Sequence, residues 1–198
     1  MVRGVKKTSK PAAEPGGQGS SQGLAFAVAD APQLAEPAVA RERLNEWLAE
    51  LGRSAAGKSL KQLIGEAPKV EALLLGLADG SPYLWDLASA DPDRLLTVLN
   101  AEPNEHLAAL LAKSSKAIAA AKDEAAAMQL LRRMKAEAAL MIAVADIGGV
   151  WPVMRTTQAL TEVADTAVRS AVRYLLREAT AAGKLKPADK NAPEEGSG

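Results

Sequence analysis

The stretch of sequence that decides the fold runs from Met128 to Leu176 and reads MQLLRRMKAEAALMIAVADIGGVWPVMRTTQALTEVADTAVRSAVRYLL. Apolar residues recur through each half of it at spacings of three and four, which places them on one face of an α-helix. The stretch therefore predicts two long amphipathic helices, each of which needs a partner to cover its apolar face. The apolar positions are Met128, Leu131, Met134, Ala138, Met141, Ile142 and Ala145 in the first half and Leu160, Val163, Ala164, Ala167, Val168, Ala171 and Leu175 in the second.

A short break from Asp146 to Gly149 separates the two predicted helices. Glu137 is the only charge between Ala136 and Ala145, which indicates that this end of the first helix is buried on most sides. A carboxylate buried there without a partner would cost several kcal/mol. We therefore expect Asp146 to cap or bridge a neighbouring group, with an arginine or backbone amides as candidate partners.

Composition favours an all-α domain. The chain has 198 residues, of which 48% are hydrophobic and only 3% aromatic, so its core must be built from Leu, Ala, Val and Met. Leu and Ala are the strongest helix formers. The predicted architecture is a multi-helix bundle in which short helices pack on two longer C-terminal helices, with disordered tails.

Charge and residue usage exclude several classes of function. The formal net charge is +0, which does not predict nucleic-acid binding. The chain has no cysteine and a single histidine, His106, so disulfides, thiolate metal sites and histidine-based triads are excluded. No apolar run is long enough to span a membrane, and residues 11–23 hold no signal core, so we expect a cytoplasmic protein without membrane or nucleic-acid partners.

Three regions follow from the distribution of Pro, Gly and apolar residues. Residues 1–37 are interpreted as a disordered leader, in which 24–28 is a short apolar segment of a flexible tail. The alternative is that 24–28 docks on the domain or on a partner. Residues 38–186 form the helical domain, and 187–198 form a flexible tail.

Proline signals mark the starts of several short helices before the long pair. Ser81-Pro82 and Asp91-Pro92 each place a capping side chain before a proline at the first helical position. Pro68 and Pro103 mark two further starts, and Gly183 follows the end of the last helix. The predicted helical segments before the long pair are 38–51, 59–64, 70–77, 83–88, 95–99 and 103–122.

Residues 52–59 read GRSAAGKS and match the phosphate-binding pattern G-x-x-x-x-G-K-[ST] in full. That loop needs a buried strand before it, but 43–51 has helical spacing and no β-branched residue. Asp79 is the only nearby candidate for holding magnesium, and it follows a leucine-rich helical run. We interpret the match as a helix-ending glycine and a flexible turn, with a nucleotidase as the weaker alternative.

Another pattern, Gly80-Ser81 followed by Asp91-Pro92-Asp93, imitates the turn and paired aspartates of nucleotidyltransferases. Two aspartates on a strand can share two magnesium ions, but a proline between them cannot join a central strand. We interpret Ser81 and Asp91 as helix caps.

His106 is interpreted as a surface residue. Arg169, Arg173 and Arg177 form a row that is interpreted as a solvated face, or alternatively as a contact for an acidic partner or a nucleotide.

The chain resembles a known family from about Arg41 to Pro187. The resemblance rests on Leu131-Arg132-Arg133, Ile142, Asp146, Gly149 and the string from Leu160 to Asp165, with support from Ser81-Pro82-Tyr83-Leu84 and Asp91-Pro92. These residues resemble the N-terminal helical region of the bifunctional glutamine synthetase adenylyltransferase/adenylyl-removing enzymes. In that family the helical region precedes the first nucleotidyltransferase domain.

The resemblance implies an enzyme that transfers AMP from ATP to a tyrosine of glutamine synthetase and removes it by phosphorolysis, with magnesium. It also implies two partners, glutamine synthetase and a nitrogen-signalling regulator protein. The chain stops at residue 198, near where the first catalytic strand is expected, so no catalytic, cofactor-binding or metal-binding residue is assigned to it. We therefore expect an inactive N-terminal fragment of such an enzyme. The alternative is a freestanding helical protein-interaction module.

Overall fold

The computed structural model describes residues 23–187 and 189. Within these residues the chain is all-α, as predicted, and holds no strand. The two longest helices, α8 and α9, cover most of the stretch between Met128 and Leu176, extend beyond it at both ends, and are joined by residues 148–152. The helices are α1 (Leu24–Ala27), α2 (Pro37–Leu51), α3 (Ala55–Glu66), α4 (Pro68–Gly80), α5 (Pro82–Ser89), α6 (Pro92–Asn100), α7 (Pro103–Ala119), α8 (Glu124–Ile147) and α9 (Val153–Ala181).

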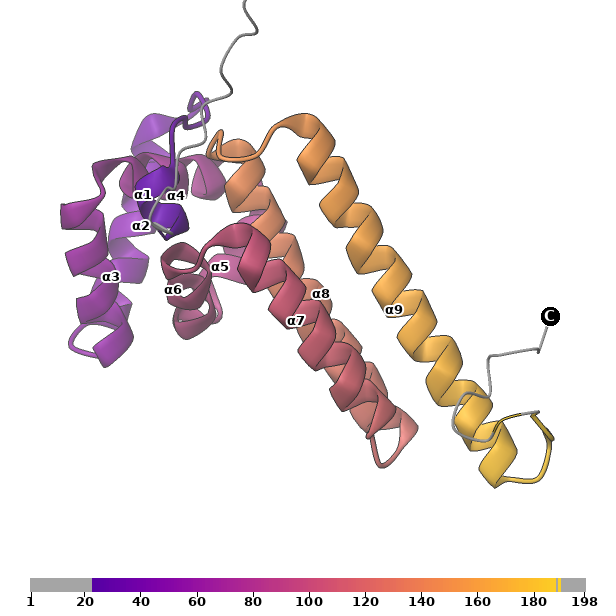
Figure 1. The fold of residues 1–198 in the computed structure, drawn as a ribbon. Helices are drawn as coiled ribbons and strands as arrows, with labels where there is room; N and C mark the ends of the chain where they lie inside the picture. Colours follow the sequence, from indigo (N-terminus) through magenta and orange to yellow (C-terminus); the bar gives the residue numbers. More distant parts are fainter. Residues whose placement is uncertain (1–22, 188, 190–198) are drawn as a thin grey trace, which may run out of the picture.

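Helices α1 to α6 gather into a lobe, from which α7 and α8 extend together (Figure 1). Helix α9 begins at the lobe end of α8, runs away from the lobe, and contacts both α7 and α8. The prediction of short helices packed on two longer C-terminal helices is therefore confirmed. None of the helices that the structure describes is long and apolar enough to cross a membrane.

The helix starts follow the predicted capping chemistry. A proline occupies the first turn of α2, α4, α5, α6 and α7. The Ser81 hydroxyl accepts a hydrogen bond from the Leu84 amide at 3.3 Å, and the Asp91 carboxylate accepts one from the Arg94 amide at 3.0 Å. These side chains satisfy amides that have no partner within the helix.

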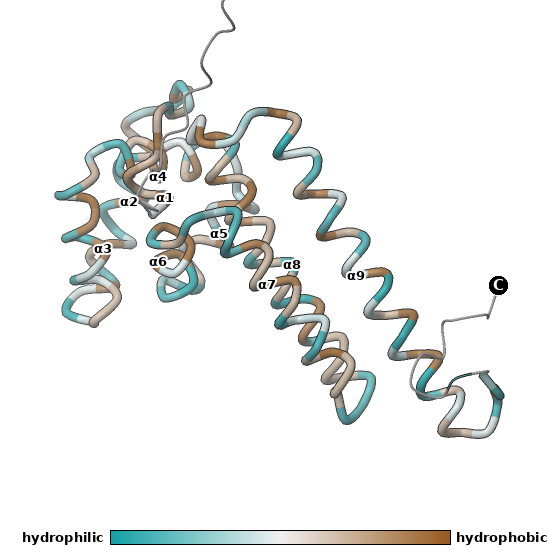
Figure 2. Tube along the Cα trace, viewed as in Figure 1, coloured by the Kyte–Doolittle hydropathy of each residue, from teal (hydrophilic) through white to brown (hydrophobic). Residues whose placement is uncertain are grey.

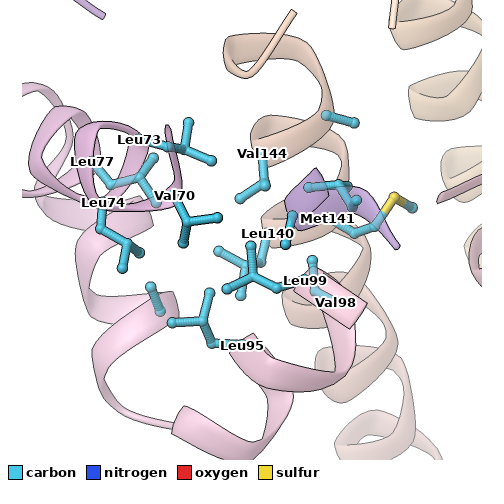
Figure 3. Close-up of a cluster of buried hydrophobic side chains, with 14 of the residues drawn as sticks. Val70, Leu73, Leu74, Leu77, Leu95, Val98, Leu99, Leu140, Met141 and Val144 are labelled. Atoms are coloured by element: carbon cyan, nitrogen blue, oxygen red, sulfur yellow. The ribbon is translucent and has the colours of Figure 1, made fainter. Parts of the chain in front are cut away.

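The core lies where α4, α6 and α8 meet (Figure 3). Helix α4 is buried around most of its circumference, as is typical of a helix without a polar face. The carboxyl half of α8 is also buried, which confirms the prediction made from its single charge. The side chains that meet there are Val70, Leu73, Leu74 and Leu77 of α4, Leu95, Val98 and Leu99 of α6, and Leu140, Met141 and Val144 of α8.

The segment before α2 is ordered, so the prediction of a disordered leader is wrong for residues 23–37. Leu24 is fully buried, and its amide donates to the Ala101 carbonyl at 2.8 Å. The amides of Ala29 and Asp30 donate to the Gly148 carbonyl at 2.8 and 3.1 Å. Docking on the domain, the alternative for 24–28, is therefore what the structure has. Residues 1–22 lie outside the described residues, as does most of the tail predicted for 187–198.

Two residues of α4 hold the rest of this segment in place. Gly76 has the Pro32 ring directly against its backbone, since a Cβ added at Gly76 would lie 2.6 Å from Pro32 Cδ. The Asp79 carboxylate accepts the amides of Ala35 and Glu36 at 2.6 and 3.0 Å. Asp79 thus caps the chain just before α2 begins, and both of its oxygens are engaged in doing so.

Candidate interaction surface

The turn between α8 and α9 is held by hydrogen bonds from both sides. The Ala145 carbonyl accepts the amides of Val150 and Trp151 at 2.9 and 3.0 Å, and Gly149 has a φ of +66°, a conformation that favours glycine. Asp146 is exposed and accepts a hydrogen bond from the Thr156 hydroxyl at 2.8 Å. The predicted bridge exists, but its partner is a hydroxyl of α9 and not an arginine or a backbone amide.

Helix α9 packs on α7 and α8 through a face of mostly small or polar residues. Ala159, Ser170 and Tyr174 are its buried residues. Ser170 Oγ lies 3.3 Å from Ser115 Oγ of α7. The Arg177 guanidinium donates to the Ala121 carbonyl at 3.1 Å and lies over the Tyr174 ring. This packing leaves Leu160, Val168 and Leu175 of α9 exposed.

Those apolar residues form a stripe on a different face of α9. We define the α9 stripe as Val153, Leu160, Ala164, Val168, Ala171 and Leu175, and hydrophobic positions recur along the helix in Figure 2. Leu160 is 54% exposed, Val168 64% and Leu175 56%. The expectation that the second apolar stripe would be covered is therefore wrong within the described residues. Of the residues predicted for that second stripe, Val163 and Ala167 are partly buried and pack against the core.

A groove of about 570 Å³ lies between the α9 stripe and α8. Apolar side chains from both helices line it, including Leu131 and Ile142 of α8 and Leu160 and Val168 of α9. The charged residues in its lining are Arg132 and Lys135, both on α8 and both exposed. Exposed apolar surfaces of this kind mark interaction sites, because covering them removes apolar area from water. This groove is the candidate interaction surface.

Residues of the phosphate-loop pattern at 52–59 end helix α2 and begin helix α3. Gly52 ends α2 with a φ of +50°, as expected of a helix-ending glycine. The prediction of a flexible turn is wrong, because helix α3 already begins at Ala55 and includes Lys58. The Ser54 hydroxyl accepts the Gly57 amide at 3.0 Å. A helix, not a strand, precedes the loop, so the nucleotidase alternative lacks its structural requirement.

The aspartates of the nucleotidyltransferase-like pattern also serve the helices. Asp91 caps α6 and lies 3.6 Å from the Arg94 guanidinium, and Asp93 lies in the first turn of that helix. The interpretation of Ser81 and Asp91 as caps is confirmed. In residues 23–187 and 189, no three side chains of the types that bind metals are grouped closely enough to hold an ion.

His106 and the arginine row differ from their sequence-based interpretations. The His106 side chain is only 15% exposed, and its Nε2 lies 2.8 Å from Glu137 Oε1, which links α7 to α8. Its prediction as a surface residue is wrong. Arg169 and Arg173 are exposed, whereas Arg177 bonds to the loop after α7. The row is therefore a solvated face only in part. No residue spacing in the sequence identified Glu137 or Ala121 as a partner, because both lie on other segments.

Within the described residues, the chain is an all-helical domain with an open apolar groove between α8 and α9. Residues 72–196 match the sequence model of the family described as glutamate-ammonia ligase adenylyltransferase. The chain belongs to this family, as its resemblance predicted.

The relatives that match the chain are bifunctional glutamine synthetase adenylyltransferase/adenylyl-removing enzymes. The enzyme of Bradyrhizobium diazoefficiens is 51% identical over 177 residues, which is 89% of this chain and 18% of the relative. Those of Rhodopseudomonas palustris strain BisB5 and Xanthobacter autotrophicus are 47% and 45% identical, each over 88% of this chain. The chain thus spans 18% of the length of these relatives. No solved structure matches it.

Proposed function

We propose that this chain is the helical region of an enzyme that attaches AMP to glutamine synthetase and removes it again, and thereby controls nitrogen assimilation. The observation that carries the proposal is the 51% identity over 177 residues to an enzyme named for both reactions. The match covers only part of that enzyme. The chain therefore contributes a scaffold to the reaction, and the chemistry belongs to the remaining part of the enzyme.

The carboxylates of the described residues support the proposal that the chemistry takes place elsewhere in the enzyme. Magnesium, which the resemblance implies together with ATP, is held by free carboxylate oxygens. Asp79 uses both oxygens to accept amides, and Asp91 is a helix cap beside Arg94. These carboxylates do not fit a magnesium–ATP site. We accordingly propose that the chain alone has no nucleotidyltransferase activity.

The setting follows from the same family membership. We propose a cytoplasmic protein whose partners are glutamine synthetase and a nitrogen-signalling regulator protein, without nucleic-acid or membrane partners. The formal net charge of +0 supports this proposal, because binding to nucleic acid or an anionic membrane surface draws on an excess of basic residues.

A chimera tests the proposal. In it, this chain replaces the matching 177-residue segment of the Bradyrhizobium diazoefficiens enzyme. We expect the chimera to transfer radiolabelled AMP from ATP to glutamine synthetase, whereas the 198-residue chain alone transfers none. A Lys58→Ala chimera is the matched control and should retain full activity. AMP transfer by the chain alone would contradict the proposal, as would a chimera no more active than the relative lacking the segment.

The exposed α9 stripe favours one alternative, a freestanding interaction module without enzymatic activity. The same experiment separates the two. A freestanding module would leave the chimera inactive, whereas the helical region of the enzyme would support AMP transfer by the chimera.

A further inference from the structure

Large apolar side chains are concentrated on the exposed side of α9. Six of the ten large hydrophobic residues exposed in the described part of the chain lie on this one helix. Three of them, Leu160, Val168 and Leu175, belong to the α9 stripe and are each more than half exposed. Single exposed apolar residues are ordinary, but a continuous row along a helix marks a surface that another element covers.

The fold itself does not need this stripe. Helix α9 is already anchored by the burial of Ala159, Ser170 and Tyr174 and by the hydrogen bonds of the turn before it. The sequence could therefore carry polar residues at 160, 168 and 175 without loss of a packing contact in the lobe. The presence of Leu, Val and Leu at these positions points to a contact outside the described residues.

The geometry of the groove indicates what kind of element fits. Along the α9 stripe, 160, 164, 168, 171 and 175 are separated by steps of three and four, the spacing at which one helix packs along another. The groove is lined by apolar side chains of α8 and α9, and its charged residues, Arg132 and Lys135, are both basic. An amphipathic helix with an apolar face and acidic residues at its edge matches this surface in shape and in charge.

The remaining part of the enzyme is the best source of such a helix. This inference rests on the proposed function, under which the described domain is tethered to the more than four-fifths of the enzyme that the match leaves out. A tethered helix is present at a high effective concentration, so it occupies the groove in preference to a second copy of the chain. We propose that an amphipathic helix from the remaining part of the enzyme docks in the groove between α8 and α9.

Photo-cross-linking in the chimera tests this docking. Benzoylphenylalanine is placed at position 168, and in a matched control at the neighbouring position 169, whose exposed side chain points about 100° away around the helix. Mass spectrometry then identifies the cross-linked peptides. We expect position 168 to cross-link to the remaining part of the same polypeptide at least tenfold more than position 169. Equal yields at the two positions would overturn the proposal, as would cross-links only between two copies.

A second variant places a charge in the proposed docking surface without unfolding the domain. Leu160→Glu, at a position that lines the groove, should leave the melting temperature of the 198-residue chain within about 2 °C of the parent, because the Leu160 side chain is 54% exposed. In the chimera the same variant should reduce the cross-link from position 168 at least tenfold, and an undiminished yield would overturn the proposal. The AMP-transfer assay is a separate readout. Transfer without the cross-link defeats the docking alone, and the cross-link without transfer defeats the proposed enzyme function alone.

Discussion

Leu24→Ala is the substitution that most directly tests the docking of the N-terminal segment. Leu24 is fully buried, although it lies in a helix of only four residues. So short a helix has no stability of its own, and the burial of its side chains in the lobe must hold it. Removing the leucine side chain therefore removes the main apolar contact of the segment and leaves a cavity beside the core.

The structure sets the size of the effect. Large-to-small changes at fully buried leucines cost about 2–5 kcal/mol, and we take a value of about 3 kcal/mol from within that range. For a domain of this size, 1 kcal/mol shifts the melting temperature by about 2–4 °C. We expect Leu24→Ala to melt about 6–12 °C below the parent chain.

Thermal unfolding followed by circular dichroism measures this shift. The matched control is Phe26→Ala in the same helix, where the ring is 50% exposed, so its truncation should cost about 1 kcal/mol or less. Hydrogen exchange adds a local readout, since the amides of Ala29 and Asp30 should lose protection in Leu24→Ala. Equal melting temperatures for the two variants would refute the docking of this segment.

Three further predictions follow from single contacts. Gly65→Ala should stabilise α3 by about 0.5–1 kcal/mol, because nothing lies near the Cβ position of Gly65. Gly76→Ala should destabilise the domain by about 1–2 kcal/mol, because its methyl group collides with Pro32. Equal effects of the two substitutions in urea denaturation would contradict this. Lys58→Ala should leave ATP affinity unchanged in calorimetric titration, because Lys58 lies in a helix and not in a phosphate loop, and a large loss would reinstate the nucleotidase. Burial raises the pKa of Glu102, but hydrogen bonds from the start of α7 and a nearby arginine outweigh it and hold the pKa below its usual value. Its contribution to stability is thus present at neutral pH and lost in acid, so Glu102→Gln should be less stable than the parent at pH 7, and the difference should shrink as the pH falls through the folded-state pKa; a constant difference would contradict this.

Local chemistry accounts for what was predictable about the helices. A capping side chain followed by a proline acts within one turn, so Ser81-Pro82 and Asp91-Pro92 marked the starts of α5 and α6 without knowledge of the fold. The spacing of apolar residues is also local and located α8 and α9. The start of α3 was predicted too late, because the phosphate-loop pattern was interpreted as a turn that includes Ser54, whereas Ser54 caps the helix.

The candidate surface was predictable only in part. The sequence identified the apolar residues of α9, since their spacing is visible, but it did not reveal that they remain exposed. Which face of a helix is buried depends on its neighbours, and here Ser115 and Ser170 hold α9 by a less apolar face. His106 was misplaced for the same reason, because Glu137 approaches it from another helix.

The sequence by itself determined the helical class, most of the helix starts and the family, because each depends on residue types and spacings within a short stretch. Only the tertiary structure decided that residues 23–37 belong to the domain. That order comes from contacts between segments far apart in the chain: Leu24 with Ala101, Ala29 with Gly148, and Pro32 with Gly76. No local pattern records such contacts, because each arises only when the helices pack.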